Sequence, residues 1–198
     1  MKRLIHAIFI FFFCLIFSGC GVKYKYYKNI FVIDTIMSII IDSDSEKALK
    51  LKNSAIKEIH RLDKIFNIHI KNSELSKVNR NAFHKPVRLS EDLFKVVNKA
   101  LYYSRLTRGA FDPTIFSLKK LWNLKNPKFK VPIQQDIGNA LKKIGCQYVE
   151  LSGKNIRFLR RGIKLDLGGI AKGYIIDRVT DLFKRNGIKN ALINIGGD

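Results

Sequence analysis

A glycine pair with an acidic residue before it and a basic residue after it is the strongest candidate for chemistry in this chain. Gly168 and Gly169 follow the alternating segment 163–167 and precede apolar residues at helical spacing, so the sequence predicts a strand, a glycine turn and a helix. Glycines let a ligand approach the backbone, and the N–H groups at a helix start favour an anion such as phosphate. Asp166 and Lys172 would flank that anion as hydrogen-bond acceptor and cation. A plain strand-to-helix connection has the same spacing, and GGIAKG matches neither common phosphate-loop motif.

A second candidate is the segment 109–114, which follows a predicted helix. Its glycine ends that helix and Pro113 fixes the exit, so Phe111 and Asp112 lie on a constrained loop. Two interpretations stay open: the loop clamps a planar ligand, or Asp112 caps the following helix with Pro113 at its first position. His69, in a polar stretch between two predicted helices, is able to stack on a ring or donate a hydrogen bond, although a lone histidine is also common on a surface.

The elements that must position these residues predict an α+β fold, a mixed sheet flanked by helices, in a single domain. No internal repeat or low-complexity tract interrupts the chain. The predicted helices follow the capping segment 43–46 and the cap Ser90, end at Trp122, cover 133–144 and start at Ile170. The predicted strands are 30–33, 36–41, 148–151, 155–159, 163–167 and a buried 188–195.

The first twenty residues predict an exported lipoprotein. Two basic residues precede the apolar run 4–17, which is too short to span a membrane comfortably and suits a signal peptide. Its end resembles the bacterial lipobox, so Cys20 is the expected lipidation site, and an ordinary signal peptide is the alternative. We therefore expect a signal peptide in 1–19, a tether in 20–30 and the folded domain in 31–198. The expected location is the bacterial cell envelope, anchored in the membrane and facing the periplasm or the exterior.

Charge and cysteine content narrow the function classes further. The chain has 37 Lys and Arg against 16 Asp and Glu, a net charge of +21. These basic residues are spread over every segment, and an export signal leads away from nucleic acid, so we expect no nucleic-acid partner and a surface suited to anionic lipid. Once Cys14 is removed and Cys20 is lipidated, Cys146 is the only free thiol, which leaves no internal disulfide.

From about residue 33 to 198 the chain resembles the ApbE family, the FAD:protein FMN transferases, which are exported lipoproteins. The similarity lies in four ordered segments, 72–79, 109–114, 165–174 and 194–198, behind the lipobox. The resemblance implies a Mg²⁺-dependent enzyme that binds FAD. A threonine hydroxyl of an acceptor protein attacks the pyrophosphate, FMN is transferred and AMP leaves, a reaction in which positioning and charge neutralisation supply most of the catalysis.

The resemblance also implies roles for individual residues. The FAD-binding set is Ile33, which stands in Ile33-Asp34-Thr35 where the family has Met-Gly-Thr, His69 in place of an aromatic residue, and Ala110, Phe111, Asp112, Asp166 and Lys172. Gly169 falls where the family offers a metal ligand, which here would be its backbone carbonyl, an oxygen suited to Mg²⁺.

The segment 194–198 indicates whether the chain contains the whole domain. A strand followed by Gly196-Gly197-Asp198 usually leads into more structure, and members of the family continue into a second half that completes the metal site. We therefore expect the chain to be a fragment, and inactive by itself. Two alternatives are a flavin-holding or interaction lipoprotein without transfer chemistry, and a remnant that neither folds nor binds.

Overall fold

A computed structural model of the chain describes residues 24–43, 45–123, 127 and 130–197. The predicted signal peptide and Cys20 lie outside the described residues. Within the described residues, no helix combines the length and the apolar character that crossing a bilayer requires.

The first sheet contains three strands in the order β1-β2-β6, and both pairings are antiparallel. β1 (Tyr24–Val32) and β2 (Thr35–Ser43) form a hairpin, and β6 (Asn190–Ile195) pairs with β2. The two-residue turn between β1 and β2 has positive φ at Ile33 (44°) and Asp34 (63°), which is the turn geometry that matches the twist of a hairpin. The predicted interruption between two strands is confirmed, but it comprises Ile33 and Asp34, and Thr35 is the first residue of β2. β1 starts inside the expected tether, so the folded region begins before residue 31.

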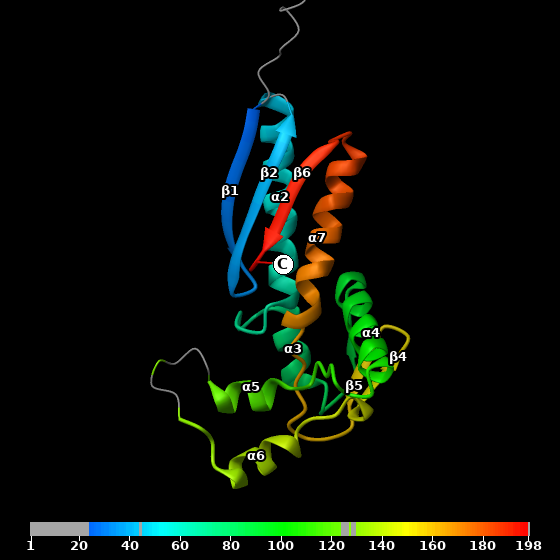
Figure 1. Cartoon of the computed structure of the whole chain (residues 1–198). Helices are drawn as coiled ribbons and strands as arrows, with labels where there is room; N and C mark the ends of the chain where they lie inside the picture. The colour runs from blue at the N-terminus through cyan, green and yellow to red at the C-terminus, as the bar shows by residue number, and fades with distance from the viewer. Residues whose placement is uncertain (1–23, 44, 124–126, 128–129, 198) are drawn as a thin grey trace, which may run out of the picture.

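Two helices, α2 (Ser45–Phe66) and α7 (Gly168–Arg185), run alongside this sheet and contact each other and its strands (Figure 1). The alternation of β2 decides which face they cover, since Met37, Ile39 and Ile41 point into the core and are almost fully buried. On α2 the predicted apolar positions Leu51, Ala55, Ile59 and Leu62 are all buried.

The second sheet has the order β3-β5-β4, again antiparallel. Its strands are β3 (Val87–Arg88), β4 (Val149–Ser152) and β5 (Asn155–Phe158). The predicted hairpin of the last two is confirmed. Around it lie α3 (Glu74–Asn81), α4 (Glu91–Leu106) and the 3₁₀ helix η1 (Cys146–Tyr148), while α5 (Phe116–Trp122) and α6 (Gln134–Leu141) pack together at the end of the molecule opposite the start of β1 (Figure 1).

The α+β class is confirmed, but the strands form two small antiparallel sheets instead of one mixed sheet, because short turns join β1 to β2 and β4 to β5. Segment 163–167 is extended without belonging to a strand. α7 starts at Gly168 itself, and neither Gly168 nor Gly169 has a positive φ, so the predicted glycine turn is wrong. β6 is also less buried than predicted, with only its last residue, Ile195, fully buried.

Candidate functional site

A cavity of about 190 Å³ lies where the β1–β2 turn, the end of α2, α5 and the start of α7 meet. Four of the residues predicted from the sequence line it: Ile33, His69, Asp166 and Lys172. The other predicted residues, Ala110, Phe111, Asp112 and Gly169, are not part of its lining. Gly168, which the sequence placed in the predicted anion-binding turn, also lines it, and the further lining residues that the sequence did not single out for binding are Phe66, Asn67, Ile68, Lys119 and Gly196.

Asp166 is the best defined polar group of the cavity. Its side chain is 7% exposed, Oδ2 lies 2.7 Å from Nζ of Lys119, and Oδ1 accepts the N–H of Gly168 at 2.9 Å. The carboxylate therefore occupies a position at the N-terminus of α7, where a negative charge is favourable. A Cβ on Gly168 would come within 3.1 Å of Oδ1, so this glycine gives Asp166 the room to fold back. Asp166 is thus a hydrogen-bond acceptor for two groups of the chain itself, Nζ of Lys119 and the N–H of Gly168.

Phe111 meets the other glycine of the pair. Gly169 is exposed, and a Cβ there would lie 3.3 Å from Cε2 of Phe111. The carbonyl of Pro113 accepts the N–H of Asp166 at 2.7 Å. The segments 109–114 and 165–174 are therefore in contact, although Phe111 packs beside the cavity without lining it. The carbonyl of Gly169 lies in the first turn of α7, where helical geometry points it along the axis, and metal ligation by this oxygen stays a prediction.

Asp112 organises its own loop. Its Oδ1 accepts the N–H of Thr114 at 2.7 Å and the hydroxyl of Thr114 at 2.6 Å, and lies 3.2 Å from Sγ of Cys146. Thr114 is fully buried and its Oγ1 accepts the N–H of Gly145 at 2.7 Å. Asp112 does not cap a helix, because the N-cap of α5 is Ile115 and makes no side-chain bond. Contact between Asp112 and FAD stays a prediction.

A hydrogen-bond network centred on Asp63 connects the β1–β2 turn to the residues that follow α2. Oδ1 of Asp63 accepts two hydrogen bonds of 2.9 Å, one from the N–H of Ile33 and one from the Nδ2 amide of Asn67. Oδ1 of Asn67 in turn accepts the N–H of His69 at 2.9 Å. The imidazole Nε2 of His69 lies 3.8 Å from Oδ2 of Asp34. Asp63 therefore fixes Ile33 and His69 relative to each other, a role that no local sequence pattern signalled.

The segment 72–79, one of the four that carry the family resemblance, makes structural contacts. Ser73 caps α3 by accepting the N–H of Ser76 at 3.1 Å, and Oε1 of Glu74 accepts the N–H of Ser90 at 2.7 Å. Asn79 makes two bonds to the backbone of Leu165, both at 2.8 Å. This segment holds the start of α4 and the approach to Asp166 in place, and none of its residues lines the cavity.

Lys119 is a charged residue of this cavity that sequence reasoning missed. It lies 47 positions from Asp166 and is one of 37 basic residues, so no spacing marked it. Its one sequence signal was its place on a short helix directly after the segment 109–114. The hydrogen bond between Pro113 and Asp166 brings this helix close to Asp166.

The sequence model of the ApbE family matches residues 33–198, which is most of the chain. The chain belongs to the ApbE family. Among its relatives, a protein of Treponema pallidum named FAD:protein FMN transferase is 25% identical over 195 residues, covering 91% of this chain and 53% of the relative. A protein of the same name from Klebsiella pneumoniae is 34% identical over 142 residues, covering 71% of this chain and 45% of the relative. The chain therefore spans about half the length of these relatives.

Solved structures of ApbE proteins have the same fold. The flavin transferase ApbE from Vibrio cholerae superposes with a TM-score of 0.81 at 24% identity, covering 88% of this chain and 58% of that one. The ApbE protein from Thermotoga maritima gives 0.78 at 27% identity, covering 87% and 57%. The architecture of the described residues is thus that of the ApbE fold.

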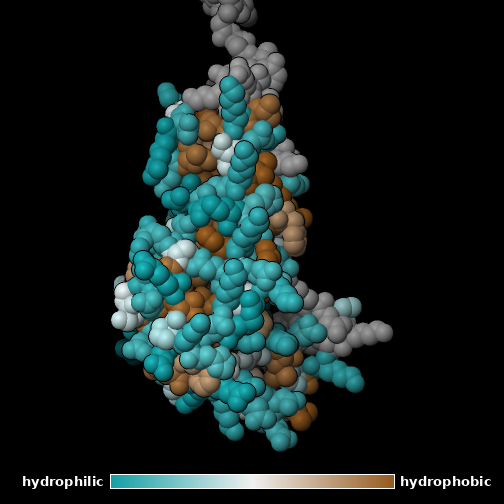
Figure 2. All heavy atoms as spheres, turned by 180° about the vertical axis from the view of Figure 1, so that it is seen from behind, coloured by the Kyte–Doolittle hydropathy of each residue, from teal (hydrophilic) through white to brown (hydrophobic). Residues whose placement is uncertain are grey.

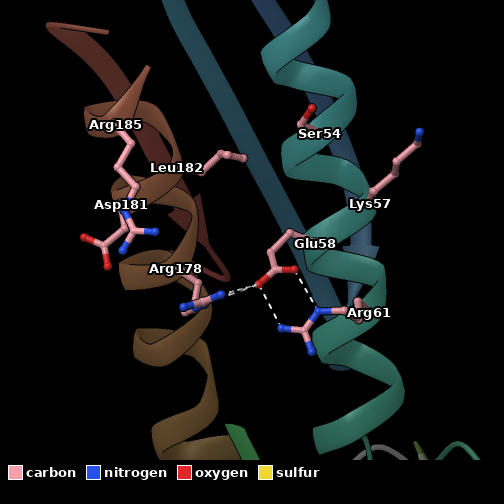
Figure 3. Close-up of a pocket in the computed structure, with 8 residues that line it drawn as sticks. All are labelled: Ser54, Lys57, Glu58, Arg61, Arg178, Asp181, Leu182 and Arg185. Atoms are coloured by element: carbon pink, nitrogen blue, oxygen red, sulfur yellow. Dashed lines mark hydrogen bonds and ion pairs between the residues drawn. The ribbon is translucent and has the colours of Figure 1, made fainter. Parts of the chain in front are cut away.

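A larger hollow of about 380 Å³ lies between α2 and α7 and contains none of the residues predicted for an ApbE site (Figure 3). Arg61 and Arg178 both bind Glu58, at 2.8 and 3.2 Å. Arg61 also lies 2.7 Å from Asp92, which accepts the hydroxyl of Tyr174 at 2.6 Å. These bonds tie α2, α4 and α7 together, so we assign this charged cluster a structural role.

The electrostatics of that cluster follow from its pairing. The hydrogen bond from Arg61 is the main reason that the pKa of Glu58 lies below its ordinary value. Burial alone would raise the pKa of Asp92, but the bonds from Tyr174 and Arg61 outweigh it and lower this pKa. Burial, with the bond to Asp92, raises the pKa of Tyr174 to about 12.

Proposed function

We propose that this protein acts in flavin transfer as an FAD:protein FMN transferase, moving FMN from FAD to a threonine of an acceptor protein with release of AMP. The observation that carries the proposal is the convergence of Ile33, His69, Asp166 and Lys172 on one cavity, in a chain of the ApbE family. These residues come from three separate parts of the chain, since Asp166 and Lys172 share the segment 165–174, and the relatives that share the family are named for this reaction.

The cavity has the chemistry to receive part of FAD. Phe66, Ile33 and Ile68 offer apolar surface to a ring, and Lys119 and Lys172 offer positive charge to a pyrophosphate. A volume of about 190 Å³ is below the range of roughly 300 to 1,000 Å³ that is usual for whole small-molecule sites. We therefore infer that the described residues hold one portion of the dinucleotide.

The proposed reaction is a phosphoryl-type transfer. The threonine oxygen forms a bond to the phosphorus of the FMN half, the bond from this phosphorus to the bridging oxygen breaks, and AMP leaves with that oxygen while the hydroxyl proton is released. The contribution of this chain is to bind and orient FAD and to balance the charge of its phosphates with Lys119 and Lys172.

We also propose that the reaction depends on Mg²⁺, as the family resemblance implies. Within the described residues, no three side chains of His, Cys, Asp or Glu gather into a group that could hold a metal ion. The described residues therefore do not supply a full ligand set, and the carbonyl of Gly169 is the one ligand that the resemblance assigns to them.

The first test is FAD binding by the 198-residue chain, followed through the anisotropy of flavin fluorescence. Lys172→Gln removes a cation that lines the cavity, and we expect the affinity for FAD to fall about tenfold, as for the loss of a charge-assisted hydrogen bond. Lys184→Gln is the matched control, because Lys184 is exposed on the same helix and outside the cavity. No FAD binding, or equal effects of the two variants, would overturn the assignment of this cavity.

The second test separates transfer from mere binding. The chain, FAD and MgCl₂ are incubated with an acceptor domain that carries a target threonine, and with its threonine-to-valine variant. Equal amounts of AMP and covalently bound flavin, seen only with threonine, support transferase activity. FAD binding without AMP supports the flavin-holding alternative. The same assay decides whether the chain by itself is inactive, as the sequence predicts.

We further propose that the protein is anchored in the bacterial cell envelope through lipidated Cys20, facing the periplasm or the exterior. The support is the lipobox-like end of the apolar segment. Expression with radiolabelled palmitate tests it, since label should appear in the wild-type protein and be absent from Cys20→Ser.

A further inference from the structure

Two adjoining hollows, of about 970 and 680 Å³, lie over α5, α6 and the loop 159–164. They share three lining residues, Asn139, Lys143 and Arg161. Among the described residues that line them, one is acidic, Asp136. The basic ones are Lys120, Lys142, Lys143, Arg160, Arg161 and Lys164, and we call these six residues and the hollows between them the basic hollow.

Several of these cations are held in place by contacts with the fold. The guanidinium carbon of Arg160 lies 3.5 Å from the centroid of the Tyr148 ring, and its NH1 donates to the carbonyl of Lys142 at 3.4 Å. The side chain of Lys143 crosses Gly162, where φ is +90° and a Cβ would lie 2.9 Å from Cγ of Lys143. The loop 159–164 and the end of α6 are thus packed together, and these contacts hold Arg160 and Lys143 close to each other.

The basic hollow also contains apolar surface. Phe116, Leu121 and Ala140 are among its lining residues. On and beside α6, Ile133 is 62% exposed and Leu141 is 53% exposed. Figure 2 shows hydrophobic residues among hydrophilic ones at the end of the molecule that carries α5 and α6. A partner that covers this surface therefore needs negative charges and some apolar side chains.

The basic hollow adjoins the proposed FAD site across a single helix. Lys119 lines the FAD cavity and binds Asp166, while its neighbour Lys120 lines the basic hollow. Consecutive residues of an α-helix are about 100° apart around the axis, so α5 presents different sides to the two regions. A chain bound in the basic hollow would lie next to the place where the flavin is held.

We propose that the basic hollow docks an acidic, partly apolar segment of the acceptor protein and so brings its threonine to the FAD site, an inference that rests on the proposed transferase function. The size of the hollow and its six cations exceed what one phosphate needs. A membrane is disfavoured because the surface is concave and lies at the end of the molecule opposite the start of β1, the strand that the predicted anchor precedes in the sequence (Figure 1).

The probe is a fluorescein-labelled twelve-residue peptide of Asp, Glu and Leu with one Thr, compared with a peptide in which Asn and Gln replace the acids. Lys120→Glu/Arg161→Glu reverses two charges that form no ion pair within the described part of the chain, and we expect the affinity for the acidic peptide to fall by at least about tenfold at low salt. Lys99→Glu/Lys184→Glu changes the net charge equally at exposed positions on α4 and α7, and we expect it to change the affinity less than about twofold.

The inference is supported if the acidic peptide binds tightly and the amide peptide binds weakly. It also requires that the affinity for the acidic peptide falls in Lys120→Glu/Arg161→Glu and not in Lys99→Glu/Lys184→Glu. Equal losses in both double variants would mean that overall charge attracts the peptide, and this would overturn it. Binding to phosphatidylglycerol vesicles without binding to the peptide would overturn it as well. FAD affinity is measured in the same samples and should stay unchanged in Lys120→Glu/Arg161→Glu. A wild-type chain that fails to bind FAD would remove the transferase proposal, so the two failures are distinguishable.

Discussion

Asn79 holds Leu165 with both ends of its side-chain amide. Nδ2 donates to the carbonyl of Leu165 and Oδ1 accepts its N–H, both at 2.8 Å. The two residues are 86 positions apart, and Leu165 is fully buried. One side chain thus gives the extended segment 163–167 the two backbone bonds that a neighbouring strand would give it, and this fixes the residue directly before Asp166.

Removing this amide should therefore destabilise the fold around the site. Asn79→Ala leaves two buried backbone groups without partners, and we expect a loss of about 2 to 4 kcal/mol in the free energy of unfolding. Urea denaturation measures it. Asn81→Ala is the control, because Nδ2 of Asn81 donates only to the carbonyl of Lys77 within the same exposed turn. Similar losses in the two variants would show that the bonds to Leu165 contribute little.

The ion pair of Lys119 and Asp166 should contribute modestly to stability. Lys119→Met leaves a carboxylate that is only 7% exposed without its cation. Because the Lys119 side chain is 51% exposed, water screens the pair, and we expect a cost of about 1 kcal/mol. Lys120→Met, the next position on α5, should change stability by less than about 0.5 kcal/mol. The double variant Lys119→Met/Asp166→Asn should regain part of the loss, and strictly additive losses would contradict the pairing.

Substituting alanine for the two glycines at the start of α7 should change stability differently from the same substitution at a third glycine of this helix. Gly173 has nothing within 4 Å of an added Cβ, so Gly173→Ala should stabilise the protein by up to about 1 kcal/mol through helix propensity. Gly168→Ala meets Asp166 at 3.1 Å and Gly169→Ala meets Phe111 at 3.3 Å, so both should gain less or lose. Thermal denaturation of the three variants provides the comparison. Equal shifts would mean that Asp166 and Phe111 yield without cost.

Stability should fall in acid through the cluster that joins α2, α4 and α7. The pKa values of Glu58 and Asp92 are lowered in the folded protein, so their contribution is present above the unfolded pKa values of about 4 and is lost as the pH falls through the folded ones. Tyr174→Phe removes the bond to Asp92 and should cost about 1 kcal/mol at pH 7. Melting temperatures between pH 7 and pH 3 should therefore converge for the wild type and Tyr174→Phe at the acid end. A constant difference at all pH values would contradict this linkage.

Cys146 should react slowly with thiol reagents. Burial, together with nearby Asp112, raises the pKa of its thiol to about 12, so almost no thiolate exists at pH 8. Iodoacetamide labelling followed by peptide mapping should show little modification of Cys146 in the folded chain and rapid modification in urea. Asp112→Asn should raise the labelling rate. Fast labelling of the native protein would show that the thiol is open to solvent.

The sequence by itself determined the α+β class, the two strand segments on either side of Asp34, the positions of most helices and the family. These features rest on local patterns, because the side-chain periodicities of 2 and 3.6 residues and the preferences of turn and cap residues act within a few positions. Local patterns singled out Asp166, Lys172 and His69 as candidates and the family resemblance added Ile33, and the fold brings these four residues to one cavity.

Only the tertiary structure decided the partners of these residues. Lys119 reaches Asp166 across 47 positions and Asn79 reaches Leu165 across 86, and no local pattern encodes such distances. The segment 163–167 alternates like a strand, yet its backbone hydrogen bonds go to the side chain of Asn79 and to the carbonyl of Pro113. Gly168 and Gly169 are the first residues of α7, and the absence of a side chain at these positions leaves room for Asp166 and Phe111. Composition showed an excess of positive charge, but folding is what gathers six of these charges into one hollow beside the site, since that requires α5, α6 and the loop 159–164 to pack together.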